Sequence, residues 1–234
     1  MSKDDSASVT FEAHEARQDE MATVDLEQAR TARPKPTPGL TAADVPIHQL
    51  SNNSVIVRLH FTINHLSRWL TPIHDRSKLD RGRHYGEPSV RDLLFELRDF
   101  ELVTFPKLHA IANVNNPDLD KLPVMVKTPD QIAEDAIIRP LSIMAEFRRL
   151  RQGTVALLRA LPDAAWARVG TSRREHDWQI RELAELLVSH DTDVLYKIDL
   201  TLDQVGARVG VGSAAKAHLD ELLRMVPVTT REVF

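Results

Sequence analysis

Apolar residues at helical spacing dominate every long segment of this 234-residue chain. Between about 53 and 70 they recur every three to four residues, which places them on one face of an α-helix. No segment shows the alternation of apolar and polar residues that is typical of a strand. The sequence therefore predicts an all-α protein. The first apolar stripe consists of Val55, Leu59, Ile63, Leu66 and Leu70, and Pro72 follows it.

A second helical segment begins at Ser89, three residues before Asp92, a spacing that suits a reciprocal cap. Pro106 is expected to kink or end this helix, because proline lacks a backbone donor and crowds the preceding turn. Its apolar stripe consists of Val90, Leu93, Leu94, Leu97, Phe100 and Leu108.

The third segment has the start signals of a helix. Thr128 is the expected cap, Pro129 takes the first helical position and Gln131 follows three residues after the cap. Pro140 interrupts the segment. We therefore expect two successive helices that end near Pro162.

The fourth segment has the clearest periodicity. Asp177 is its expected cap, and the glycine-containing stretch 206–212 ends it. A short terminal helix is expected from Ser213 to Met225. The stripe of the fourth segment consists of Ile180, Leu183, Leu187, Val194 and Ile198.

Composition indicates one main domain with appended ends. With 42% hydrophobic and 27% charged residues, the chain can bury one sizeable core. Residues 1–45 are polar, and the prolines between Pro34 and Pro38 favour an extended linker, so we expect a disordered arm that packs little against the rest. The predicted division is an arm at 1–45, a helical bundle at 46–205, and a C-terminal helix and tail at 206–234.

Charge and cysteine content exclude several classes of function. A net charge of −4 argues against a dedicated nucleic-acid-binding protein, which usually needs a basic face. The absence of cysteine leaves His, Asp and Glu as the metal ligands. The polar start and the lack of a long apolar run predict a cytoplasmic protein with no membrane span. Phosphate-binding loops, dinucleotide fingerprints and zinc-protease motifs do not occur.

Two segments resemble the metal-bearing helices of the DinB/YfiT-like superfamily of four-helix bundles. In that family one helix carries Ser-x-x-Glu-x-x-x-His-Leu-x-Asp, and the last carries His-Asp-x-x-x-His. Glu96 stands at the histidine position of the first motif, and Val194 stands at the second histidine of the other. The resemblance covers about residues 50–205. The positions that match are Ser89, Asp92, Leu97, Asp99, His190 and Asp191.

The resemblance implies a metal site of which Glu96 and His190 remain. Three readings stay open: an interior hydrogen-bonded pair, a rebuilt site that recruits water, Asp191, Asp193 or His60, and a metal-free pair for acid–base chemistry or ligand binding. A catalytic metal commonly needs three protein ligands. No cofactor is therefore expected, and zinc or nickel should bind weakly or not at all.

Two functional hypotheses follow. The first is a bundle that binds a small molecule or a protein partner, and the second is a divalent-metal-dependent transferase, isomerase or hydrolase of the DinB-like kind. His84 and Tyr85, in a loop before the second helix, are candidate substrate contacts. His60 and His65 are expected at the surface. A homodimer is compatible with either hypothesis.

Overall fold

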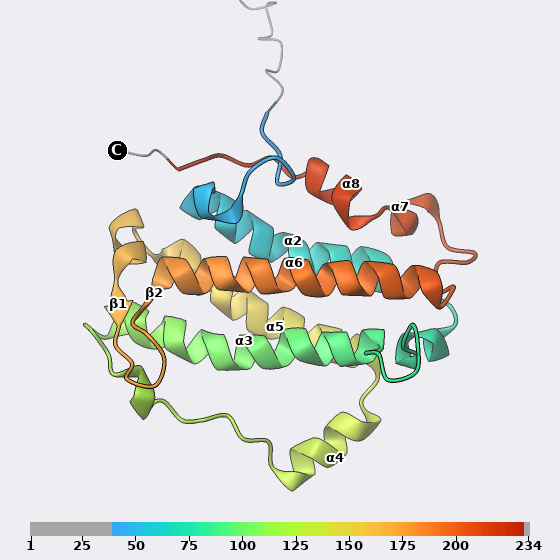
Figure 1. Cartoon of the computed structure of the whole chain (residues 1–234), viewed down its shortest axis with the longest axis horizontal. Helices are drawn as coiled ribbons and strands as arrows, with labels where there is room; N and C mark the ends of the chain where they lie inside the picture. The colour runs from blue at the N-terminus through green and yellow to red at the C-terminus, as the bar shows by residue number, and fades with distance from the viewer. Residues whose placement is uncertain (1–38, 232–234) are drawn as a thin grey trace, which may run out of the picture. The chain divides into compact units, whose positions relative to one another are not determined.

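A computed structural model describes residues 39–231 of the protein and shows a bundle of four long helices (Figure 1). The helices are α2 (Asn52–Leu70), α3 (Val90–Asn113), α5 (Pro140–Ala160) and α6 (Ile180–Gln204). Both α2 and α3 pack against both α5 and α6. In Figure 1, α2 and α6 run in one direction and α3 and α5 in the other. The predicted all-α class is confirmed.

The first predicted stripe forms the buried face of α2. Ser51 caps the helix by accepting a hydrogen bond from the backbone N–H of Ser54. All five residues of the predicted stripe are buried, as is Trp69. Burial of this face against α5 and α6 supplies the apolar stabilisation that a helix of this length needs in water.

Helix α3 begins as predicted but does not end at Pro106. The reciprocal cap between Ser89 and Asp92 is present. Pro106 does not end the helix, because α3 continues to Asn113, so this part of the prediction is wrong. Proline removes one backbone hydrogen bond, whereas the next turns bury Leu108 and Ile111 completely. The packing of these two side chains stabilises the helix beyond Pro106.

The third segment forms two helices, as predicted. Helix α4 (Pro129–Ile137) has Thr128 and Gln131 in a reciprocal cap, and α5 starts at Pro140. α4 buries none of its residues. Figure 1 shows it standing away from the four long helices, at the end of an extended segment. Short 3-10 turns occur elsewhere as η1 (Ile47–Gln49), η2 (Arg76–Asp80), η3 (Leu119–Lys121) and η4 (Asp163–Ala167).

Helix α6 is capped by Gln179 and Glu182, not by Asp177. Gln179 belongs to a small hairpin of β1 (Val169–Gly170) and β2 (Trp178–Gln179), and Asp177 accepts a hydrogen bond from Ser172 inside its loop. A Cβ on Gly170 would lie 2.7 Å from a side-chain carbon of Ile111. Glycine is therefore required where the hairpin touches α3.

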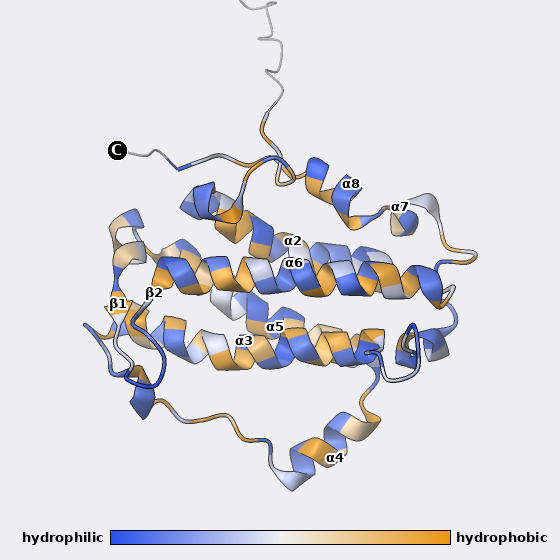
Figure 2. Ribbon diagram, in the orientation of Figure 1, coloured by the Kyte–Doolittle hydropathy of each residue, from blue (hydrophilic) through white to orange (hydrophobic). Residues whose placement is uncertain are grey.

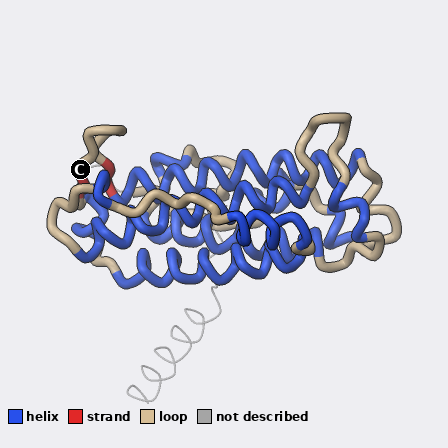
Figure 3. The backbone as a smooth tube through the Cα atoms, turned by 90° about the horizontal axis from the view of Figure 1, so that it is seen from below, coloured by secondary structure: helices blue, strands red, loops and turns tan. Residues whose placement is uncertain are grey.

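The C-terminal segment belongs to the bundle. The predicted single helix is two short ones, α7 (Ser213–Lys216) and α8 (Leu219–Arg224). Val226 and Val228 are buried, and the Val228 N–H donates to the Leu40 carbonyl at 3.0 Å. Figure 3, which is seen from below, shows that helices make up most of the described chain and that strand is confined to one small place. The compact unit starts at Leu40 and includes this segment. The division at 45 and 206 stays a prediction. Residues 1–38 of the predicted arm lie outside the described residues.

Candidate functional site

Helices α3 and α6 bring the two predicted metal-site residues together. His190 Nε2 lies 3.5 Å from Glu96 Oε1, and the imidazole stacks on Phe100 with ring centroids 3.8 Å apart. The pair lies at the edge of the bundle, since the side chain of Glu96 is 39% exposed. Burial lowers the pKa of His190 below its usual value, although Asp191 and Glu96 oppose the shift. The ring is thus predominantly neutral near pH 7.

The residues around this pair do not complete a metal site. Val194 is fully buried in the apolar core, and Lys197 Nζ lies 3.3 Å from the Glu96 carboxylate. A cation beside the carboxylate disfavours a second cation there. Within the described part of the chain, no third His, Asp or Glu joins the pair in metal-ligand geometry. The residues present do not fit the metal that the resemblance implies.

The alternative ligands named from the sequence are engaged elsewhere or exposed. Asp191 is 2% exposed and binds Arg151. Asp193 and His60 are exposed to solvent. None of the three supplies the missing ligand.

A buried ion network crosses the centre of the bundle. Arg151 of α5 and Glu101 of α3 are completely buried. Arg151 donates to Glu101 at 2.7 Å and to Asp191 of α6 at 3.0 Å. Thr154 donates to Glu101, and Thr62 of α2 donates to Asp191. All four long helices therefore contribute to one set of hydrogen bonds.

The charges of this network balance when Arg58 is included. Burial alone would lower the pKa of Arg151, but Asp191 and Glu101 raise it above its usual value. Arg58 donates to Thr192 at 2.8 Å. Burial lowers the pKa of Arg58, and nearby Asp191 opposes that shift. Two guanidinium groups and two carboxylates thus neutralise each other inside the core, which fits a structural role.

The sequence carried a signal for this network. Arg151 follows Ile143 and Phe147 at steps of four, on the buried face of α5. Glu101 and Asp191 likewise follow Leu97 and Leu187 by four residues. A charge within an apolar stripe on three different helices indicates that the charges meet, because an unpaired buried charge is costly.

His65 is a buried residue, so its predicted surface position is wrong. It is 3% exposed, and neither ring nitrogen has a hydrogen-bond partner among residues 39–231. Burial is the main cause that lowers the pKa of His65 to about 4, with contributions from Arg68 and Arg58. A cavity of about 10 Å³ is lined by His65, Arg58 and Leu223 of α8, among other residues. This space matches a single water molecule.

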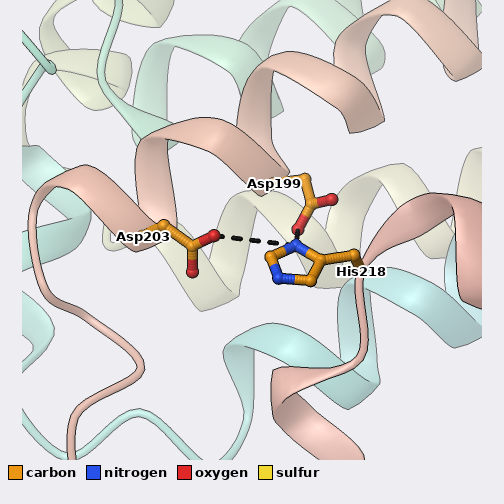
Figure 4. Close-up of side chains that lie close together, drawn as sticks. All are labelled: Asp199, Asp203 and His218. Atoms are coloured by element: carbon orange, nitrogen blue, oxygen red, sulfur yellow. Dashed lines mark ion pairs between the residues drawn. The ribbon is translucent and has the colours of Figure 1, made fainter.

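A second candidate metal group lies where α6 meets the C-terminal segment. Figure 4 shows Asp199, Asp203 and His218, whose ligand atoms all lie within 4.8 Å of one another. Arg208 donates to both carboxylates, to Asp203 at 2.8 Å. The Leu219 N–H donates to Asp199 at 2.9 Å. One guanidinium thus already pairs with both carboxylates, and the group fastens α8 to α6.

His84 and Tyr85, the predicted substrate contacts, lie in the loop between η2 and α3. Both are exposed, Tyr85 fully. Neither residue lines the cleft between α4 and the long helices.

A hollow with mainly apolar walls lies between α4 and the long helices. We call residues 123–138 the strap and the space between the strap, α3 and α5 the strap cleft, which has a volume of about 550 Å³. Figure 2 shows apolar positions on the strap, away from the four-helix core. Within the strap, Val124 and Val126 are more than 70% exposed. The apolar side chains that line the cleft are Leu102, Val103, Met125, Val126, Ile138 and Leu150.

Ion pairs hold the strap on the bundle. Arg98 of α3 donates to Asp135 of α4 at 2.7 Å, and Lys127 Nζ lies 2.9 Å from Asp135 and 2.6 Å from Asp99. The hydrogen bonds from Arg98 are the main cause that lowers the pKa of Asp135 to about 2. Sequence reasoning missed the cleft because the periodicity of α4 predicts a helix packed on its neighbours.

Comparison with solved structures supports the fold. No family model matches the chain, and neither does any curated protein. YfiT from Bacillus subtilis, described as a probable metal-dependent hydrolase with an unusual four-helix bundle topology, matches with a TM-score of 0.53 at 17% identity. The match covers 76% of this chain and 96% of YfiT.

Two structures of a mycothiol-dependent maleylpyruvate isomerase, one of them a histidine-to-alanine mutant, also match. Each has a TM-score of 0.45, with identities of 12% and 14%, and covers 75% of this chain and 68% of the isomerase. The likeness to YfiT is a likeness of fold: this chain, too, is a four-helix bundle.

Proposed function

We propose that the protein binds a small molecule in the strap cleft and does not act as a three-histidine metalloenzyme. The cleft itself carries the proposal. Its volume of about 550 Å³ falls in the range of small-molecule sites, and six apolar side chains line it. Val103 and Met125 are about half exposed. Covering them would remove apolar surface from water and so favour binding.

The composition around Glu96 supports the non-metal part of the proposal. A catalytic zinc site usually has three protein ligands and one open position. Here Val194 offers methyl groups at one ligand position, and Lys197 offers a positive charge beside another. The imidazole of His190 is held by stacking on Phe100. These contacts favour a structural role for the pair.

A divalent-metal-dependent enzyme is the second candidate. The observation in its favour is the 3.5 Å approach of His190 to Glu96, at positions that carry ligands in the resembling family. YfiT is described as a probable metal-dependent hydrolase. On this hypothesis zinc or nickel would be held by Glu96 and His190, with water completing the coordination.

Binding of a neutral apolar dye, Nile red, tests the first candidate. We expect a saturable increase in fluorescence with the native protein. Val103→Trp places an indole in the cleft and should abolish the increase. Val209→Trp is the matched control, because Val209 is exposed and lies outside the cleft. Equal fluorescence from both variants would contradict the proposed site.

Calorimetric titration with zinc separates the two candidates. The proposal predicts weak or no heat of binding with the native protein. Tight, one-to-one binding that disappears in His190→Ala would favour the metal-dependent enzyme. Binding that instead disappears in Asp203→Asn would assign the metal to the Asp199, Asp203 and His218 group.

A further inference from the structure

The charged side chains of the strap cleft are unequal in number. Four carboxylates and three cationic groups line it, which leaves one negative charge in excess. The cationic groups belong to Arg98, Lys127 and Arg149. The carboxylates belong to Asp99, Glu134, Asp135 and Glu146. The balance of ligand-accessible charge depends on which of these groups are already paired.

Two of the three cations are committed to the protein. Arg98 donates to Asp99 at 2.9 Å, to Asp135 at 2.7 Å and to Glu146 at 3.1 Å. Lys127 binds Asp99 and Asp135. Both cations also lie over the Phe95 ring, 4.7 and 5.4 Å from its centroid. An anionic ligand would have to break these contacts to reach either group.

Two of the carboxylates, Glu134 and Glu146, have oxygen atoms that are not used in ion pairs within the described part of the chain. Glu134 is exposed and forms no ion pair with any described residue. The side chain of Glu146 is 33% exposed, and only its Oε2 accepts the hydrogen bond from Arg98. The third cation, Arg149, is exposed and likewise forms no ion pair within residues 39–231. Both Arg149 and Glu146 also border a second, open hollow along α5, with Arg148 and Gln152.

We propose that the ligand of the strap cleft is an apolar amine. Its ammonium group binds the carboxylates of Glu134 and Glu146 through charge-assisted hydrogen bonds, while its apolar body covers Leu102, Val103 and Leu150. This inference rests on the proposed function, because it specifies the ligand of the same cleft. No covalent step is involved.

Three probes with one alkyl chain and different head groups test the inference. Octylamine, octan-1-ol and octanoate are titrated calorimetrically into the full chain at pH 7 and low ionic strength. We expect octylamine to bind about tenfold or more tightly than octanoate, because a hydrogen bond to a charged group contributes on the order of 1.5–3 kcal/mol. Val103→Trp should weaken all three.

Charge-neutral variants locate the ammonium site. Glu134→Gln and Glu146→Gln together should reduce octylamine affinity about tenfold and leave octan-1-ol unchanged. Glu221→Gln is the matched control, because Glu221 is exposed on α8 and distant from the cleft lining. An equal loss of octan-1-ol affinity in the double variant would mean that the carboxylates only support the strap, which overturns the inference.

The remaining outcomes distinguish the two proposals. If octanoate binds as tightly as octylamine and its affinity falls in Arg149→Ala, the ligand is a carboxylic acid and the amine proposal is wrong. The proposed binding function would then still hold. Absence of binding by all three probes and by Nile red would overturn the proposed function together with this inference.

Discussion

Arg151 shows how a single residue can tie the four long helices together. Its guanidinium lies between the carboxylates of Glu101 and Asp191, and its Nη1 also donates to the Leu59 carbonyl. A buried ion pair gives a net stabilisation only when its geometry and hydrogen bonds are complete. Here the donors and acceptors match closely, so loss of one partner leaves the others uncompensated.

Arg151→Met should destabilise the protein by about 3–5 kcal/mol, because it leaves two buried carboxylates without their cation. Urea unfolding at pH 7 measures the change. Arg148→Met on the exposed face of the same helix is the control and should change the free energy of unfolding by about 0.5 kcal/mol or less. A loss below about 1 kcal/mol in Arg151→Met would contradict a paired, dry network.

The quadruple variant Arg58→Met, Glu101→Met, Arg151→Met and Asp191→Leu separates charge from packing. Replacement of a whole buried ion network by apolar residues is often neutral or stabilising. We expect the quadruple variant to regain most of the stability lost in Arg151→Met.

His65 predicts a loss of stability in acid. Its pKa is lowered from 6.5 in the unfolded chain to about 4 in the folded protein. Below pH 6.5 the unfolded state takes up a proton that the folded state does not, so stability falls as the pH decreases towards 4. The expected loss is on the order of a few kcal/mol.

Urea unfolding of native protein and His65→Leu between pH 7.5 and 4.5 measures this effect. The leucine variant cannot titrate at this position, so its stability relative to native protein should rise as the pH falls. A constant difference across the range would argue against a buried neutral imidazole.

At the scale of elements, helices α3 and α6 bring Glu96 and His190 together without completing a metal site. Their axes bring Glu96 and His190 within 3.5 Å, and residues 190 and 194 lie one helical turn apart. The apolar stripe of α6 continues through Val194, so an apolar side chain occupies the position of the second histidine in the family motif. The backbone arrangement is therefore compatible with metal binding, and the side chains are not.

Val194→His combined with Glu96→His should create a zinc site. The double variant places two imidazoles on α6 and one on α3, and we expect tight one-to-one zinc binding by calorimetry, with weak or no binding in Glu96→His alone. Loss of the buried valine should cost about 1 kcal/mol or more without metal. Failure of the double variant to bind zinc, with its helical circular dichroism intact, would contradict the alignment with the family motif.

On the scale of the whole molecule, the C-terminal segment closes the bundle along α2 and α6. Asp199 accepts hydrogen bonds from Arg208 and from the Leu219 N–H, which fastens both sides of the connection between α6 and α8. Leu222 and Val226 then bury their side chains in the core. Among the described residues, no helix is long and apolar enough to cross a membrane.

Asp199→Asn should loosen the C-terminal segment selectively. The change removes the charge that pairs with the buried Arg208, and we expect amide exchange to accelerate within residues 213–231. Exchange in α3 and α5 should stay slow, because their core contacts do not involve this group. Asp220→Asn on the exposed face of α8 is the control. Uniform acceleration throughout the bundle would mean that the segment and the helices unfold together.

The sequence alone determined the helices and most of their ends. Apolar stripes predict α2, α3 and α6. The caps at Ser89 and Thr128 are hydrogen bonds between residues three positions apart, which a sequence shows directly. Family resemblance added the four-helix arrangement. Asp177 is not the cap because the β1–β2 hairpin continues to Gln179, which directly precedes α6.

Only the tertiary structure decided which residues meet. The Arg151 network joins positions 40 to 50 residues apart, and the approach of Val228 to Leu40 spans nearly the whole described chain. The strap cleft exists because α4, although periodic, is held by ion pairs at Asp135 and not by burial. Periodicity and capping act within a few residues, whereas a site depends on how separate helices pack, and packing is not encoded in any one segment.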